Sequence, residues 1–215
     1  MKTTLRHAKI ELVLHTLREG EGRALLLLHG LGESAAREDA RWYPAWPGPI
    51  HALDFTGHGE STIPVGGGYA AEFLMADADA ALAHLGAVTL CGRGLGAYVA
   101  LLLAGSRPAE VTGAILCDGP GLAGGGSQPS TPTLPGIDPS DTGPPDPFAL
   151  VELARDLRPT DYALEYVRQV EAFSELDRPL TVCAVQRPEW LQAVVDAPSV
   201  AEAPLDDALA YYARL

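Results

Sequence analysis

Residues 28–34 of the chain read Leu-His-Gly-Leu-Gly-Glu-Ser, and they begin at the end of a continuous apolar run, Ala24–His29. A run of this length without alternation predicts a β-strand that is buried on both faces of a sheet. A glycine-rich turn directly after such a strand allows backbone N–H groups to point into a crevice, which is the geometry that an oxyanion hole needs. This stretch therefore predicts a parallel sheet with an anion-accepting turn at one strand end.

Two further turns follow predicted strands in the same way. Residues 54–61, Asp-Phe-Thr-Gly-His-Gly-Glu-Ser, come after a short strand at Ile50–Asp54. Residues 92–96, Gly-Arg-Gly-Leu-Gly, lie between a strand at Ala87–Cys91 and an apolar helix at Leu95–Gly105. Open α/β sheets bind ligands at the carboxyl ends of their strands, so the three turns together predict one site at that edge.

The rest of the chain alternates between strand and helix patterns. Strands are predicted at Leu5–Ile10, Leu12–Leu17, Val111–Cys117 and Leu180–Val185, and helices at Tyr69–Leu85, Phe148–Leu157, Asp161–Phe173 and Leu205–Leu215, with a weak helix at Ser34–Trp46. Thirteen of the 27 residues from Gly121 to Pro147 are glycine or proline, which predicts a long surface loop. The alternation predicts an α/β fold with a mostly parallel, twisted sheet and helices on both faces.

In their order and spacing the three turns resemble those of the α/β-hydrolase fold superfamily. The resemblance covers most of the chain, implies one domain over residues 1–215, and places a short Gly/Pro-rich lid at about 121–173. It implies a Gly-x-nucleophile-x-Gly elbow centred on Gly94, 65 residues after His29. It also implies an oxyanion niche formed by the backbone N–H groups of Leu31 and Leu95.

The catalytic positions of that family are largely vacant here. The elbow centre is Gly94, which has no side chain to attack a substrate, and none of the six histidines lies beyond His84. Asp118 is the candidate acid, with Glu189 as a second carboxylate, but an acid alone does not make a triad. We therefore expect a degenerate, non-hydrolytic member of the superfamily that binds a small acidic or carbonyl-bearing molecule or is retained for protein association. The predicted pocket residues are His29, Gly30, Gly32, Asp54, His58, Arg93, Gly94 and Asp118.

Several alternatives remain open at this stage. The first is an active, esterase-like hydrolase in which His58, His29 or a carboxylate activates water, with His58 as the candidate base. Residues 92–97 also fit Gly-x-Gly-x-x-Ala, which with Asp118 would be a dinucleotide-binding fingerprint. A metal site from His29, Asp54 and His58 is conceivable but shows no metal-specific spacing, so we expect no metal and no cofactor.

The three cysteines, Cys91, Cys117 and Cys183, all lie near predicted strand ends. A replacement thiol nucleophile is one interpretation, and small buried residues of a parallel sheet is the favoured one.

Composition limits the classes of partner. The formal net charge is −13, whereas nucleic acid and anionic membrane surfaces select for clustered positive charge, so neither is an expected partner. The apolar runs are shorter than a membrane span, and the first ten residues lack the layout of a secretory signal. Together with three widely spaced cysteines, these features predict a cytoplasmic protein. They do not indicate an oligomeric state.

Overall fold

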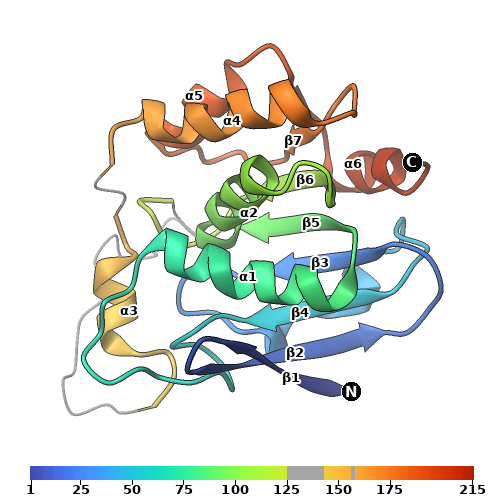
Figure 1. The fold of residues 1–215 in the computed structure, drawn as a ribbon. Coiled ribbons are helices and arrows are strands. Elements are labelled where there is room, and N and C mark those ends of the chain that lie inside the picture. Colours follow the sequence, from blue (N-terminus) through green and yellow to red (C-terminus); the bar gives the residue numbers. More distant parts are fainter. Residues whose placement is uncertain (125–142, 156–157) are drawn as a thin grey trace.

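The computed structural model describes residues 1–124, 143–155 and 158–215. Its eight strands form one sheet in the order β1-β2-β4-β3-β5-β6-β7-β8. β1 pairs with β2, and β2 with β4, in antiparallel fashion, and every other pair is parallel. The predicted mostly parallel sheet is thus confirmed, with an antiparallel hairpin added at one edge (Figure 1).

The strands are β1 Lys2–His7, β2 Ile10–Arg18, β3 Ala24–Leu28, β4 Ile50–Asp54, β5 Val88–Arg93, β6 Val111–Cys117, β7 Leu180–Val182 and β8 Val200–Glu202. The α-helices are α1 Ala71–Leu85, α2 Leu95–Ser106, α3 Pro147–Glu152, α4 Asp161–Phe173, α5 Glu189–Val195 and α6 Leu205–Tyr212. Two short 3-10 helices, η1 Ala35–Arg37 and η2 Ala40–Trp42, precede β4.

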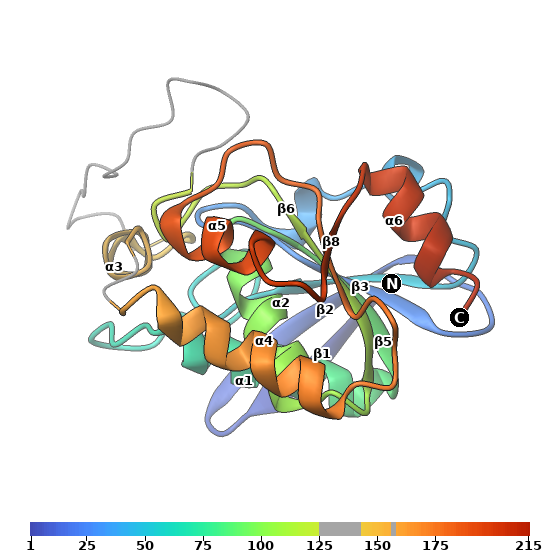
Figure 2. The ribbon, with the colours of Figure 1, turned by 90° about the horizontal axis from the view of Figure 1, so that it is seen from above.

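Both faces of the sheet are covered by helices, as predicted. α1, α2 and α4 lie on one face, and α6 lies on the other (Figures 1 and 2). The sheet, α1 and α4 enclose α2, and eleven of its twelve residues are buried. This position explains why α2 has no polar face. On the second face Trp46, Leu209 and Tyr212 form a separate core. β3 lies between β4 and β5 in a sheet that is covered on both faces, and all five of its residues are buried.

Several predicted elements have different bounds in the structure. The single weak helix at Ser34–Trp46 is instead the pair of 3-10 turns, since Pro44 and Pro47 interrupt any continuous helix. The helix predicted at Phe148–Leu157 ends at Glu152, and the strand predicted at Leu180–Val185 ends at Val182. α5 and β8 were not predicted, although they lie directly before the position where the superfamily carries its histidine.

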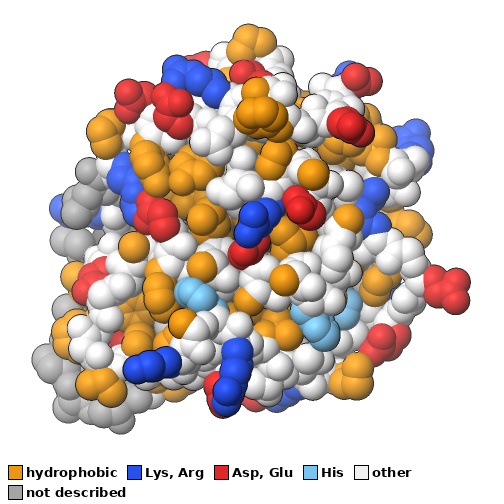
Figure 3. All heavy atoms as spheres, in the orientation of Figure 1, with side chains coloured by type: hydrophobic (Ala, Val, Ile, Leu, Met, Phe, Trp, Pro, Cys, Tyr) orange, Lys and Arg blue, Asp and Glu red, His pale blue; other side chains and the backbone are white. Residues whose placement is uncertain are grey.

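The predicted lid, residues 121–173, includes α3 and α4, and most of the Gly/Pro-rich loop within it lies outside the described residues. α3 is joined to the second glycine turn, because the backbone N–H of Asp146 donates to the Gly57 carbonyl oxygen at 2.8 Å. On the face that carries α1 and α4, acidic side chains alternate with lysines and arginines, so the negative charge does not form one continuous patch there (Figure 3). Within the described residues, every helix is too short or too polar to cross a lipid bilayer.

Candidate functional site

The strand–turn–helix elbow is present at the end of β5. Gly94 has φ +51° and ψ −112°, and it is the residue between β5 and α2. Its small neighbours are required by close packing, because a side chain at Gly92 would overlap the Gly96 carbonyl group and one at Gly96 would overlap the Leu28 carbonyl group. The turn therefore keeps the sharp backbone that presents a nucleophile in acyl-transfer enzymes, and it presents none.

The two amides expected to form an oxyanion niche converge on one acceptor, the carbonyl oxygen of Pro120. The N–H of Leu31 donates to this oxygen at 2.9 Å, and the N–H of Leu95 donates to it at 3.0 Å. Two donors on one oxygen is the geometry that stabilises an oxyanion. Here the oxygen belongs to the chain itself, in the segment that follows β6.

The same segment fills the space where a nucleophile would stand. A Cβ atom at Gly94 would lie 2.5 Å from the Gly119 carbonyl oxygen and closer still to the Pro120 oxygen. On the opposite side, a Cβ at Gly30 would lie 2.6 Å from the proline ring. Gly119–Pro120 is thus a plug of backbone between the first glycine turn and the elbow. Sequence analysis did not identify Pro120, because a backbone acceptor carries no side-chain signal.

The His29 side chain has a structural role in the first two glycine turns. Its Nδ1 donates to the Gly30 carbonyl oxygen at 2.8 Å, and its Nε2 accepts the Phe55 N–H at 3.1 Å, so both ring nitrogens are used. The side chain is 1% exposed, and burial lowers its pKa. His29 is therefore a neutral imidazole that joins the first glycine turn to the second.

His58 lies beside it, with the two ring centroids 5.1 Å apart. Its Nδ1 donates to the Thr56 carbonyl oxygen at 3.1 Å, and its buried Nε2 has no hydrogen-bond partner among the described residues. Burial, reinforced by the nearby His29, lowers the pKa of His58 to about 3. A base this weak is poorly matched to proton abstraction at neutral pH.

The low pKa of His58 predicts a loss of stability on the acid side. An unfolded histidine takes up a proton below about pH 6.5, whereas folded His58 remains neutral down to about pH 3. The unfolded state therefore binds more protons in this window, and the free energy of unfolding falls as the pH falls, by up to about 1.4 kcal/mol per pH unit. Urea denaturation of the wild type and of His58→Asn, which keeps a donor for Thr56, should give a shallower pH slope for the variant. Equal slopes would contradict the assignment.

Asp54 is the structural centre of the second turn. Its carboxylate lies 2.9 Å from Nε2 of His15 on β2, and it accepts the N–H groups of Ala35 at 2.7 Å and Glu60 at 3.0 Å. The side chain is completely buried. With His29 and His58 also closed to solvent, these three predicted pocket residues do not line an open cavity. In the described parts of the chain, no group of three or more His, Cys, Asp or Glu side chains is arranged to hold a metal ion.

Asp118, the candidate acid, connects two loops. Its carboxylate accepts the backbone N–H of Val185 at 2.7 Å and that of Gln186 at 2.6 Å. Arg93 lies next to it, with Nε 3.3 Å from the Asp118 backbone oxygen and a guanidinium nitrogen 3.5 Å from the Glu33 carboxylate. Asp118 thus joins the end of β6 to the segment after β7. The superfamily's histidine position, after β8, is occupied by Ala203 and Pro204.

The remaining glycine of the first turn, Gly32, lies beneath the lid helix. A Cβ at this position would be 3.2 Å from Cδ2 of Leu150 on α3. Glu33 closes the turn by accepting the Gly30 N–H at 3.0 Å.

The structure does not favour the dinucleotide-binding interpretation of residues 92–97. A pyrophosphate would bind the first amide of α2, that of Leu95, and this amide already donates to Pro120.

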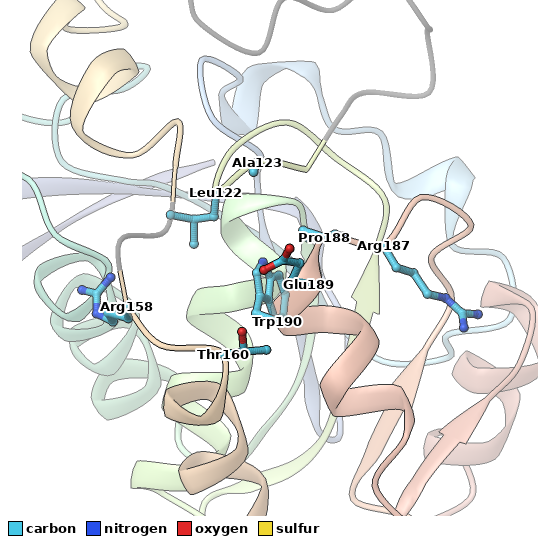
Figure 4. A pocket seen from close by; sticks show the side chains of 8 residues that line it. All are labelled: Leu122, Ala123, Arg158, Thr160, Arg187, Pro188, Glu189 and Trp190. Atoms are coloured by element: carbon cyan, nitrogen blue, oxygen red, sulfur yellow. The ribbon is translucent and has the colours of Figure 1, made fainter.

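A cavity of about 350 Å³ lies next to the plug, on the side of α4 and α5. Its lining residues come from the turn after β6, from the segment before α4, and from the residues around the start of α5: Leu122, Ala123, Arg158, Thr160, Arg187, Pro188, Glu189 and Trp190. Figure 4 shows Glu189 and Trp190 between the turn and Thr160, with the two arginines on opposite sides. Arg158 pairs with Glu72 and Arg187 with Glu202, so both charges are matched within the chain. Sequence analysis did not predict this cavity.

Comparison with known proteins assigns the fold. Residues 25–215 match the model of the Alpha/beta hydrolase family. Among solved structures, the chain is similar to the hypothetical protein PA1622 from Pseudomonas aeruginosa PAO1 (TM-score 0.68, 20% identity, 99% of this chain and 98% of that chain). It is also similar to the thioesterase domain from the curacin biosynthetic pathway (TM-score 0.66, 18% identity, 100% and 97%). A match to epoxide hydrolase VrEH1 from Vigna radiata (TM-score 0.46, 26% identity) covers 56% of this chain and only 40% of that one.

The protein is thus an α/β-hydrolase-fold protein by sheet order, elbow and glycine turns. More particularly, the chain belongs to the Alpha/beta hydrolase family, whose model matches nearly its whole length. No curated protein sequence matches it significantly.

Proposed function

We propose that this chain is a non-hydrolytic member of the α/β-hydrolase family that binds a small molecule. The observation that carries the proposal is the Pro120 carbonyl oxygen, which accepts both niche amides, 2.9 Å from the Leu31 nitrogen and 3.0 Å from the Leu95 nitrogen. An oxyanion hole acts on charge that develops in the transition state, and it needs donors that are available at that moment. These donors already have a permanent acceptor.

The other parts of acyl transfer support the same proposal. The elbow has hydrogen in place of a nucleophile at Gly94, and the sequence holds no histidine after His84. His58 is buried with a pKa of about 3, and the Asp118 carboxylate holds two backbone amides. A nucleophile, a general base and an oxyanion hole each contribute separately to the rate of acyl transfer. Because all three are missing or occupied here, we expect no acyl transfer by the mechanism that uses them.

The cavity beside the plug is the place that we assign to the ligand. Its volume of about 350 Å³ lies within the range of small-molecule pockets. Leu122, Pro188 and Trp190 provide apolar surface, while Thr160 and Glu189 provide polar groups. This position replaces the pocket predicted around His29 and Asp54, whose side chains are buried.

The test has a catalytic arm and a binding arm. In the first, the folded chain is mixed with a serine-directed fluorophosphonate probe and with a short-chain aryl ester. We expect no labelling and no turnover above that of heat-denatured protein. Turnover that is present in the wild type and lost in His58→Asn, while this variant remains folded, would instead support a hydrolase that activates water.

In the binding arm, the melting temperature is measured with a panel of small carboxylic acids and their methyl esters. A compound that binds the native state raises the melting temperature with concentration. Thr160→Phe narrows the cavity, and Gln169→Phe places the same ring at an exposed position of α4, the helix that directly follows Thr160, as a control. The increase should be retained in the control and lost in Thr160→Phe. An equal increase in both variants, or none with any compound, would overturn the assignment of this cavity.

A further inference from the structure

Three cysteine side chains from separate parts of the sequence come together on one face of the sheet. Cys91 is on β5, Cys117 ends β6, and Cys183 directly follows β7, and all three are free thiols. Cys91 belongs to the core cluster that includes Leu209 and Tyr212 of α6, and Cys117 and Cys183 pack against that cluster. α6 lies on the face of the sheet opposite to α1 and α2 (Figure 2). Cys117 is next to both other thiols, each of which shifts its pKa. The proposed function does not use this cluster.

Cys117 and Cys183 are neighbours in strand register. The parallel ladder of β6 and β7 pairs Ile115 with Thr181 and Leu116 with Val182, so the next pair is Cys117 with Cys183. The Cys183 N–H continues the ladder by donating to the Leu116 carbonyl oxygen at 2.8 Å. Adjacent strands are about 4.7–4.9 Å apart, which is within the roughly 4.4–6.8 Å between Cα atoms that a disulfide bridges.

The backbone beyond the two cysteines is held in place as well. The Asp118 carboxylate accepts the N–H groups of Val185 and Gln186 just past Cys183. Cys117 and Cys183 are residues of intermediate burial, whereas Cys91 is 3% exposed. The Cys183 thiol is less buried than the Cys117 thiol, so an oxidant reaches Cys183 first. The arrangement does not suit a metal ion, because no group of three ligands in the described residues has the required geometry.

From this register and proximity, we propose that Cys117 and Cys183 form a reversible disulfide by exchange with a low-molecular-weight disulfide such as glutathione disulfide. One cysteine thiolate attacks a sulfur of glutathione disulfide and displaces a glutathione thiolate, which takes up the proton that the cysteine lost. The second cysteine then attacks the mixed disulfide and releases the second glutathione. Two protein thiols are oxidised, and one disulfide is reduced to two thiols.

The bond would act on the segment that fills the elbow. Cys117 is two residues before Gly119, and Gly94 donates its N–H to the Cys117 carbonyl oxygen at 3.1 Å. A link to β7 would therefore fix the start of the plug relative to the rest of the sheet. In-register side chains on parallel strands are about one strand spacing apart, whereas a disulfide holds its Cβ atoms within about 3.5–4.5 Å. The Cα spacing suits a disulfide, but the two Cβ atoms must move closer together to form the bond, so the bond would be strained and readily reduced.

The rate should depend steeply on pH. The interaction with Cys117 and burial raise the pKa of Cys183. For Cys117, the interaction with Cys183 lowers the pKa, but the interaction with Cys91 and burial together outweigh it, so the pKa of Cys117 is also raised. Since only the thiolate attacks, the rate at neutral pH should be low and should increase about tenfold per pH unit while the thiol form predominates.

The experiment incubates the reduced full chain with glutathione disulfide at several pH values, blocks remaining thiols with an alkylating agent, and maps the peptides by mass spectrometry. We expect a peptide pair joined through Cys117 and Cys183, which disappears on treatment with dithiothreitol. Cys117→Ala and Cys183→Ala should each abolish it and leave a glutathione adduct on the remaining partner, while Cys91→Ala should retain it.

Three results would overturn the proposal: a bond that includes Cys91, glutathione adducts on the wild type without an internal bond, or no oxidation at any pH. The peptide map of the wild type decides between these outcomes even if a variant fails to fold.

Discussion

Replacing Gly94 with serine is expected to yield a less stable protein and no esterase. A Cβ at this position would overlap the Pro120 carbonyl oxygen and lie 2.5 Å from that of Gly119. These are backbone atoms of a segment that is held by Leu31 and Leu95, so they cannot move without breaking both hydrogen bonds. Overpacking of this kind costs about 1–3 kcal/mol. Urea denaturation should report a loss of this size in the free energy of unfolding.

The cost of a side chain in a positive-φ conformation must be distinguished from the cost of the steric overlap. Gly86 is a suitable control, because it has φ +77° and ψ −152°, and a Cβ atom added there would have no other atom within 4 Å. Ala at Gly86 therefore measures the cost of a positive-φ conformation without a collision. We expect Gly94→Ala to cost clearly more than Gly86→Ala. Equal losses would mean that the plug yields easily and does not define the native elbow.

The catalytic outcome is independent of the stability measurement. A serine at position 94 would find no histidine after residue 84 to accept its proton, and general-base assistance is worth about 10²–10⁴-fold. Hydrolysis of an aryl ester by Gly94→Ser should therefore remain at the level of the wild type. Rates typical of an active hydrolase in this single variant would show that another group serves as the base, and the proposed function would fail.

The fold was predictable because its strongest signals are local. The uninterrupted apolar run that forms β3 has to be buried on both faces, and the glycines at Gly92 and Gly96 are required by contacts around one strand–turn–helix unit. A three-residue strand carries little periodicity, and for this reason β8 was missed. α5 does carry a signal, because Trp190, Leu191 and Val194 have helical spacing after Pro188.

The candidate site was less predictable because its decisive contacts connect distant residues through the backbone. Almost every residue of the chain carries a backbone carbonyl oxygen that could accept the N–H groups of Leu31 and Leu95. The sequence therefore does not identify Pro120 as the acceptor. The vacant nucleophile position at Gly94 can be read directly from the sequence, whereas the closure of that position cannot. The roles of His29 and His58 were likewise open until their burial and hydrogen bonds were known.

Replacing Asp54 with alanine is expected to have the largest effect on stability of any change considered. The substitution removes the acceptor of the Ala35 and Glu60 N–H groups and the partner of the His15 imidazole, all around a carboxylate with no solvent exposure. Removing one member of a buried charged network costs about 3–5 kcal/mol. For a chain of this size that corresponds to a decrease in melting temperature of roughly 6–20 °C.

A matched control is Asp79→Ala, which removes the partner of Arg107 in an ion pair whose side chains are 35% and 50% exposed. Exposed pairs contribute about 0–1 kcal/mol, so this variant should melt close to the wild type. Asp54→Asn should lie between the two, because its amide oxygen can still accept the Ala35 N–H while its amide nitrogen cannot accept from Glu60. If Asp54→Ala melts like Asp79→Ala, the second turn does not depend on this carboxylate for its structure. The buried Asp54–His15 pair would then need a role in binding or chemistry, which a purely structural interpretation of the turn does not provide.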